Sequence, residues 1–138
     1  MILVIRISGM VDVPEKMKNT LFRMRLRRKY SAVLLDSSER NLKILKKIRN
    51  YVAYGNINDI MLKKLIEKRA ESLNKAKVNS EKIISELNKK NLEDQGIKPF
   101  FRLHPPRGGI DSKKHFGVNK GVLGNNKDSI NKLLGKML

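Results

Sequence analysis

The stretch ILVIRIS, residues 2–8, decides how the rest of the chain is interpreted. It is apolar and rich in β-branched residues, a composition that favours a β-strand, and Gly9 ends the run. A helical pattern follows from Met17 to about Arg23, and SAVLLD, residues 31–36, then predicts a second strand. Strand and helix therefore alternate from the start of the chain.

The alternation continues through a second helix and a third strand. Ser37 or Ser38 can cap a helix over residues 39–49, and YVAYGN, residues 51–56, predicts a strand. The order strand–helix–strand–helix–strand within residues 1–57 predicts an α+β fold, in which a compact β-α-β-α-β module has a three-stranded sheet with two helices on one face. We expect the other face to stay open unless a partner covers it.

Two further segments complete the expected organisation. Residues 58–96 predict a helical insertion, with one helix capped by Asn58 and another by Asn79 or Ser80. Residues 97–138 predict an extended basic segment that ends in a helix. Because residues 97–125 show no regular period, we expect a long loop held at both ends.

The charge balance is the strongest compositional signal. The chain has 138 residues with 31 Lys and Arg against 13 Asp and Glu, a net charge of +18. Residues 1–56 carry a net +9 and residues 96–138 a net +7, whereas the middle carries only +2. An excess of this size repels itself in the folded state and predicts a nucleic-acid or other anionic partner, rather than serving solubility alone.

Composition also excludes several classes of protein. There are no cysteines, which excludes disulfides and thiolate metal sites. No apolar run approaches the roughly 20 residues that span a bilayer. The first ten residues are apolar but broken at Arg6, with no basic segment before them, so we expect a strand rather than a signal peptide and a cytoplasmic location.

A first basic cluster lies between the first helix and the second strand. A period-two alternation over residues 24–27 predicts that Met24 and Leu26 point inward and that Arg25 and Arg27 point outward. The planar guanidinium group of arginine can donate two hydrogen bonds to phosphate oxygens at once, so this cluster predicts RNA or DNA contact. A solvated helix end would explain one or two cations, but not the five found here: Arg23, Arg25, Arg27, Arg28 and Lys29.

A second basic cluster lies in FFRLHPPRGGIDSKKHF, residues 100–116. The two prolines stiffen the backbone, the two glycines allow it to approach another surface closely, and the histidine rings can stack on unpaired bases. The alternative interpretation is an ordered surface loop whose basic residues occur there by chance. The candidate RNA contacts are Arg102, His104, Arg107, Gly108, Gly109, Lys113, Lys114 and His115, with Lys120 beyond them.

Catalysis, metal binding and cofactor binding receive little support. His104 and His115 could act as an acid–base pair in RNA cleavage, but no carboxylate flanks either one. Two histidines without cysteine make a poor zinc site, and the glycines of residues 117–124 do not fit a phosphate-binding loop. We expect no metal, cofactor, small-molecule substrate or membrane contact.

These residues resemble a known family. The N-terminal module, with ILVIRISG and TLFRMRLRRKYSAVLLD, is similar to the L-thirty family of large-ribosomal-subunit proteins. The remainder resembles the long archaeal and eukaryotic form, whose eukaryotic counterpart is called ribosomal protein L-seven. The segments that carry this are VAYGNI (52–57), KRAE (68–71), EDQGIKP (93–99), FRLHPPRGGIDSKKHF (101–116) and GNNKDSINKLLGKM (124–137).

The resemblance implies a structural protein of the large ribosomal subunit that binds rRNA without catalysis. Implied partners are large-subunit rRNA and neighbouring ribosomal proteins, with 5S rRNA as a further candidate, and the implied location is the ribosome in the cytoplasm. Residues 72–92 look shorter than in some archaeal relatives, and the long basic N-terminal arm of eukaryotic members is missing. A non-ribosomal RNA-processing protein that uses His104 and His115, and a free nucleic-acid compaction protein, remain alternatives.

Overall fold

The computed structural model describes residues 1–138 apart from 10, 12, 73–78, 88–91 and 93. The strands are β1 (Ile2–Arg6), β2 (Ser31–Leu35), β3 (Val52–Asn56), β4 (Phe101–Arg102), β5 (Asp111–His115) and β6 (Gly121–Asn125). The helices are α1 (Glu15–Arg23), α2 (Glu39–Ile48), α3 (Asp59–Arg69), α4 (Ser80–Glu86), the short 3-10 helix η1 (Lys127–Ser129) and α5 (Ile130–Met137). The α+β class predicted from the sequence is confirmed.

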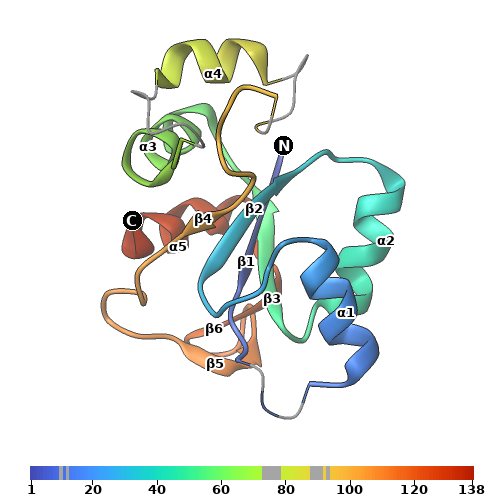
Figure 1. Ribbon diagram of the computed structural model, residues 1–138. Coiled ribbons are helices and arrows are strands. Elements are labelled where there is room, and N and C mark those ends of the chain that lie inside the picture. Colours follow the sequence, from blue (N-terminus) through green and yellow to red (C-terminus); the bar gives the residue numbers. More distant parts are fainter. Residues whose placement is uncertain (10, 12, 73–78, 88–91, 93) are drawn as a thin grey trace.

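The predicted module forms the middle of the molecule. β1 lies between β2 and β3 and is antiparallel to both, so that Val4 faces Val33 on one side and Tyr54 on the other. α1 and α2 lie together on one face of these strands (Figure 1). Leu21 of α1 and Leu45 of α2 pack there against a core of sheet residues. The three strands and two helices therefore form as predicted.

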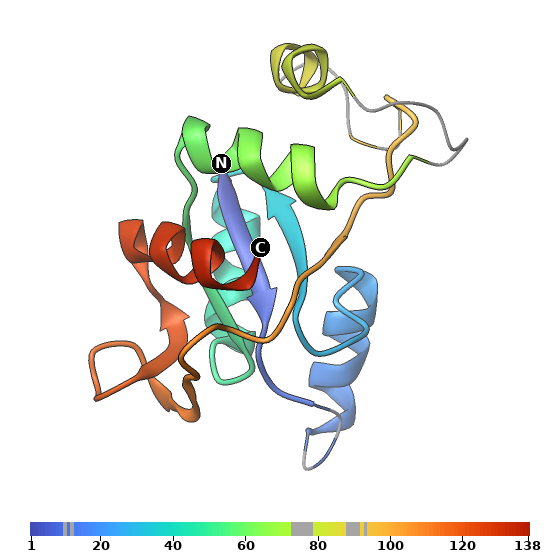
Figure 2. The same cartoon turned by 90° about the vertical axis from the view of Figure 1, so that its left-hand side faces the viewer.

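The second face of the sheet is covered by the chain itself, so the expectation that it stays open is wrong. Strand residues alternate between faces, and the β1 residues that point away from α1 and α2 pack with α3 and α5 (Figure 2). The buried residues of those two helices are Leu62, Leu65, Ile66, Ile130, Leu133, Leu134 and Met137. Because both faces are buried, β1 is apolar at nearly every position.

Gly55 in β3 permits the last helical region to approach the sheet. A Cβ atom on Gly55 would collide with the backbone oxygen of Lys127 and lie 2.9 Å from Cβ of Ile130. β3 therefore needs a residue without a side chain where η1 and α5 cross it.

The sheet has six strands, in the order β4-β2-β1-β3-β6-β5. The expectation of a long loop over residues 97–125 is wrong. This segment supplies β4 at one edge of the sheet and β6 and β5 at the other edge. β4 pairs antiparallel with β2, and β6 pairs parallel with β3. The final helix is present, as predicted.

Three helices begin at the residues expected from the sequence. The side chains of Ser38, Asn58 and Asn79 accept hydrogen bonds from backbone N–H groups three residues further on, at 3.3, 2.8 and 3.3 Å. These caps satisfy donors that have no partner inside the helix. No helix in the described part of the chain is long and apolar enough to cross a bilayer.

Candidate nucleic-acid interface

The arginine loop, residues 24–30, connects α1 to β2. Leu26 is buried and Met24 is half-buried, whereas Arg25 and Arg27 are exposed, as the alternation predicted. The backbone is a series of turns rather than a strand, with Arg25 at φ 64° and Tyr30 at φ 66°. The loop therefore presents its arginines outward around one apolar anchor, Leu26.

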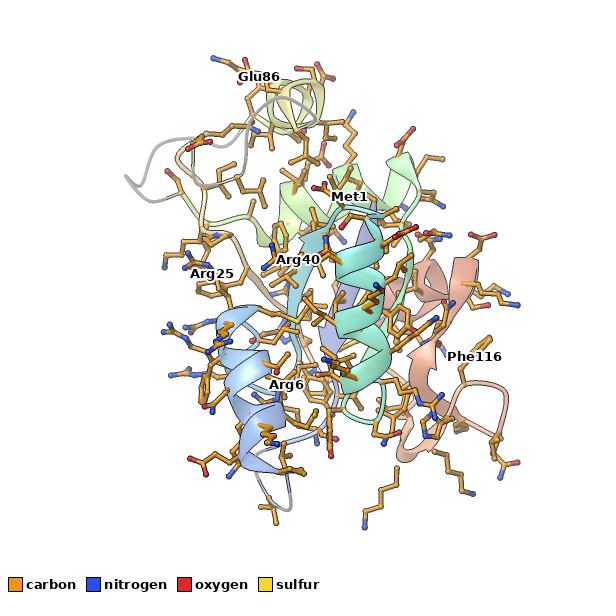
Figure 3. All side chains as sticks on the ribbon, turned by 90° about the vertical axis from the view of Figure 1, so that its right-hand side faces the viewer. Met1, Arg6, Arg25, Arg40, Glu86 and Phe116 are labelled. Atoms are coloured by element: carbon orange, nitrogen blue, oxygen red, sulfur yellow. The ribbon has the colours of Figure 1, made fainter. Side chains whose placement is uncertain are left out.

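Arg6 holds this loop from inside the fold. Its side chain is only 1% exposed, and Figure 3 places it inward of α1. Nη1 donates to the carbonyl of Leu26 at 2.7 Å, while Nε and Nη2 donate to the carbonyls of Ser8 and Gly9 at 2.9 and 3.2 Å. Burial lowers the pKa of the Arg6 guanidinium.

The sequence interpretation did not assign Arg6 a role. The available signal was a single cation inside an otherwise apolar strand. Long charged side chains are rarely buried unless they are well paired, so such a cation indicates a specific set of acceptors nearby.

Pairing of β4 with β2 brings Arg102 of the second predicted cluster beside the first cluster. Arg102 is the partner of Ser31, directly after the arginine loop. A pocket of about 190 Å³, the arginine pocket, opens at this point. Its lining consists of Arg25, Arg27, Arg28, Ser31, Phe100 and Arg102. The sequence assigned Arg102 to the second cluster, but in the folded chain it lies beside the first.

The arginine pocket combines positive charge with a flat ring. Cζ of Arg102 lies 5.7 Å from the centroid of the Phe100 ring, which is a cation–π contact. Within the described ranges, Arg27, Arg28 and Arg102 form no ion pair with a carboxylate. The guanidinium groups of Arg27, Arg28 and Arg102 therefore line the pocket without a direct carboxylate partner in the described part of the chain.

Arg102 also acts electrostatically on Glu71. A hydrogen bond from Lys98, with Nζ 2.8 Å from Oε2, is the main cause that lowers the pKa of Glu71, and the charges of Lys98 and Arg102 lower it further. Glu71 is thus already paired with Lys98 beside the pocket.

The remaining predicted residues of the second cluster lie beside α5 and along β5 and the turn after it. The backbone N–H groups of His104 and Arg107 donate to the carbonyls of Met137 and Lys136 at 2.9 and 3.0 Å, which docks this segment on the end of α5. A groove of about 550 Å³, the basic groove, lies beside it. Its cations are Arg107, Lys120, Lys132 and Lys136, and Phe116 also lines it.

Lys132 and Lys136 were missed at the sequence level. They belong to α5, whose sequence pattern predicted only an apolar face, and the docking of residues 104–107 against the end of this helix makes its lysines border the groove. The spacing of Lys132 and Lys136 by four residues, which puts them on one helix face, was the available signal.

Gly108 and Gly109 are explained by backbone conformation. Their φ angles are +78° and +73°, in the left-handed region that glycine adopts without strain. A Cβ atom on either would meet nothing within 4 Å. The folded chain therefore requires glycine here before any partner is considered, and close approach to RNA remains a separate prediction.

His104 and His115 lie on different elements. His104 is in the extended segment beside α5, and His115 ends β5, with its Nδ1 3.6 Å from where a Cβ of Gly124 would lie. Both are exposed, as are Lys113 and Lys114. The described residues contain no group of three or more His, Asp or Glu side chains arranged to hold a metal ion.

The fold and its basic surfaces define a small α+β protein with the chemistry of phosphate recognition. Residues 2–52 match the family model described as ribosomal protein L30p/L7e. The large ribosomal subunit protein uL30 of Aeropyrum pernix is 39% identical, over 98% of this chain and 97% of that protein. Proteins of the same name from Archaeoglobus fulgidus and Methanococcus maripaludis are 35% and 34% identical over nearly their full lengths. The chain belongs to the ribosomal protein L30p/L7e family, which confirms the resemblance seen in the sequence.

Proposed function

We propose that this protein is a structural constituent of the large ribosomal subunit that binds and positions rRNA through its basic surfaces. The observation that carries the proposal is the arginine pocket, where a loop after α1 and a strand some seventy residues later contribute guanidinium groups to one site. Full-length similarity to proteins named large ribosomal subunit protein uL30 supports the same assignment.

The contacts divide into two regions. The first contains Arg23, Arg25, Arg27, Arg28, Lys29 and Arg102. The second contains His104, Arg107, Gly108, Gly109, Lys113, Lys114, His115 and Lys120, to which the structure adds Lys132 and Lys136. In Figure 3, Arg25 of the first region lies on the left, near the upper end of α1, whereas Phe116, which lines the basic groove, lies on the right.

A rigid sheet between two cationic regions suits a protein that fixes the distance between RNA segments. The guanidinium and ammonium groups neutralise phosphates that would otherwise repel each other, and the packed sheet holds the two regions apart. Candidate partners are large-subunit rRNA, neighbouring large-subunit proteins and 5S rRNA, in the ribosome of the cytoplasm.

A rival function is RNA cleavage by His104 and His115. General acid–base chemistry needs each imidazole to be oriented, and no described residue hydrogen-bonds either ring. We therefore propose that the protein acts without catalysis. Loss of an RNA cleavage activity in His115→Ala, with RNA binding retained, would support the rival.

The test of the proposed function is sedimentation. Lysate of the cells that carry this protein is fractionated on sucrose gradients at moderate and at high salt, and each fraction is probed for the chain. We expect it to travel with the large subunit and to resist the salt wash. A chain that stays at the top of both gradients would overturn the ribosomal assignment.

A further inference from the structure

The arginine pocket is hollow, whereas a regular RNA helix offers only its outer phosphates to a protein. The pocket is about 190 Å³, smaller than the roughly 300–1,000 Å³ of pockets for drug-sized ligands. A space of that size suits one planar base better than a longer segment. We propose that the pocket receives a single unpaired nucleotide that projects from the bound RNA, an inference that rests on RNA being the partner.

The lining groups match the two parts of such a nucleotide. Phe100 and the guanidinium plane of Arg102 are the flat groups, on which an unpaired base can stack. Arg27 and Arg28 supply forked donors for the phosphate that accompanies the base. Stacking tolerates any base, so these groups predict recognition of an unpaired nucleotide rather than of a particular sequence.

The pocket is also held in shape before any ligand arrives. Phe100 packs against the core between the sheet and α1–α2, and the pairing of Arg102 with Ser31 fixes the position of β4. Arg6 fixes the opposite rim by its bond to the Leu26 carbonyl. A preformed site avoids the ordering cost that a flexible loop incurs on binding.

Electrostatics favours an occupied pocket. Within the described ranges no carboxylate pairs with Arg27, Arg28 or Arg102. Guanidinium groups that share one small concave space raise each other's energy, and a phosphate that enters relieves this.

The experiment compares two fluorescently labelled RNA hairpins that differ only in one extra, unpaired adenosine in the stem. Their dissociation constants are measured by anisotropy at one fixed salt concentration. We expect the wild-type chain to bind the bulged hairpin about fivefold or more tightly than the paired one, the lower end of what one stacked base contributes. Phe100→Leu should reduce this ratio to within twofold.

Two further variants sharpen the comparison. Phe22→Leu makes the same change at a ring that is 39% exposed on α1 outside the pocket, and should keep the wild-type ratio. Arg102→Lys keeps the charge but removes the plane, and should lose the preference even if Phe100→Leu proves too unstable to use. Thermal unfolding of each variant shows which of them retain the fold.

The outcomes separate the pocket from the proposed function. Equal binding of both hairpins by the wild type, or a preference that survives both Phe100→Leu and Arg102→Lys, overturns the nucleotide pocket while RNA binding stands. Free adenosine monophosphate that binds as tightly as the bulged hairpin would make this a site for free nucleotides instead. If neither hairpin binds and the chain also stays off the large subunit, the proposed function itself fails.

Discussion

Replacing both Arg27 and Arg28 by glutamine should change the salt dependence of RNA binding by a calculable amount. Both side chains are exposed and line the arginine pocket. Each phosphate contact contributes about −0.9 to the slope of log affinity against log salt for a duplex, and about −0.7 for a single strand. Loss of two contacts should therefore make the slope shallower by about 1.8 on duplex RNA.

That change in slope has a direct experimental consequence. Between 50 and 200 mM salt the wild-type affinity should fall about 12-fold further than the affinity of the double variant, because a fourfold rise in salt is raised to the power of about 1.8. The assay is anisotropy of a labelled rRNA fragment over a salt series. Substitutions of exposed surface residues usually change stability by less than about 0.5 kcal/mol, so unfolding should be nearly unaffected.

A matched control removes the same charge elsewhere. Lys64 and Lys68 are exposed on α3, within the segment whose net charge is only +2. The variant Lys64→Gln/Lys68→Gln should keep the wild-type slope. If the arginine variant keeps that slope and the lysine variant makes it shallower, the assignment of the arginine pocket as a phosphate-binding surface is refuted.

Three more predictions concern the framework of the interface. Arg6→Met should lower the free energy of unfolding by about 1–3 kcal/mol, measured by urea unfolding, since the buried Leu26 carbonyl loses its donor. It should also weaken RNA binding, measured by anisotropy, although Arg6 is only 1% exposed. Unchanged RNA affinity would show that the arginine loop does not need this anchor. Gly55→Ala should lower the free energy of unfolding by about 1–3 kcal/mol, because the new Cβ atom collides with the backbone oxygen of Lys127. Gly9→Ala is the control and should have little effect, because a Cβ atom there meets nothing within 4 Å. Glu71→Gln should cost at most about 1 kcal/mol at pH 7, because the side chains of the Lys98–Glu71 pair are exposed (39% and 49%). Since the pKa of Glu71 is lowered in the folded state, the stabilisation is present above the ordinary carboxyl pKa and is lost as the pH falls through the folded-state pKa. Wild type and variant should therefore have the same unfolding free energy near pH 2.

Local patterns were enough to predict the N-terminal module. β1 is rich in β-branched residues, β3 combines Val52 and Tyr54 with Gly55, and α2 begins at the capping side chain of Ser38. These signals lie within a few residues of the structure that they specify. The alternation that turned Leu26 inward was equally local, although the backbone around it is a set of turns.

The later strands depend on contacts between distant residues. β5 reads DSKKH and carries none of the Val, Ile, Thr, Tyr, Phe and Trp residues that favour strands, so nothing in its own sequence favours a strand. It becomes one because β6 offers a pairing edge, and β6 in turn is placed by β3. Strand preference depends on neighbours more than helix preference does, and for that reason residues 97–125 looked like a loop.

The same dependence explains why the arginine pocket could not be foreseen. The sequence identified Arg27 and Arg102 as cations and assigned them to two surfaces, because about seventy residues separate them. Their meeting requires that Ser31 face Arg102 in the β2–β4 pair, and a slip of one residue would turn the Arg102 side chain to the other face of the sheet. Phe101, the buried partner of Ala32, favours that register, since a slip of one residue would turn its ring away from the core in which it packs. The charge of this interface was therefore visible in the composition, while its shape depends on the register of a strand pair between distant residues.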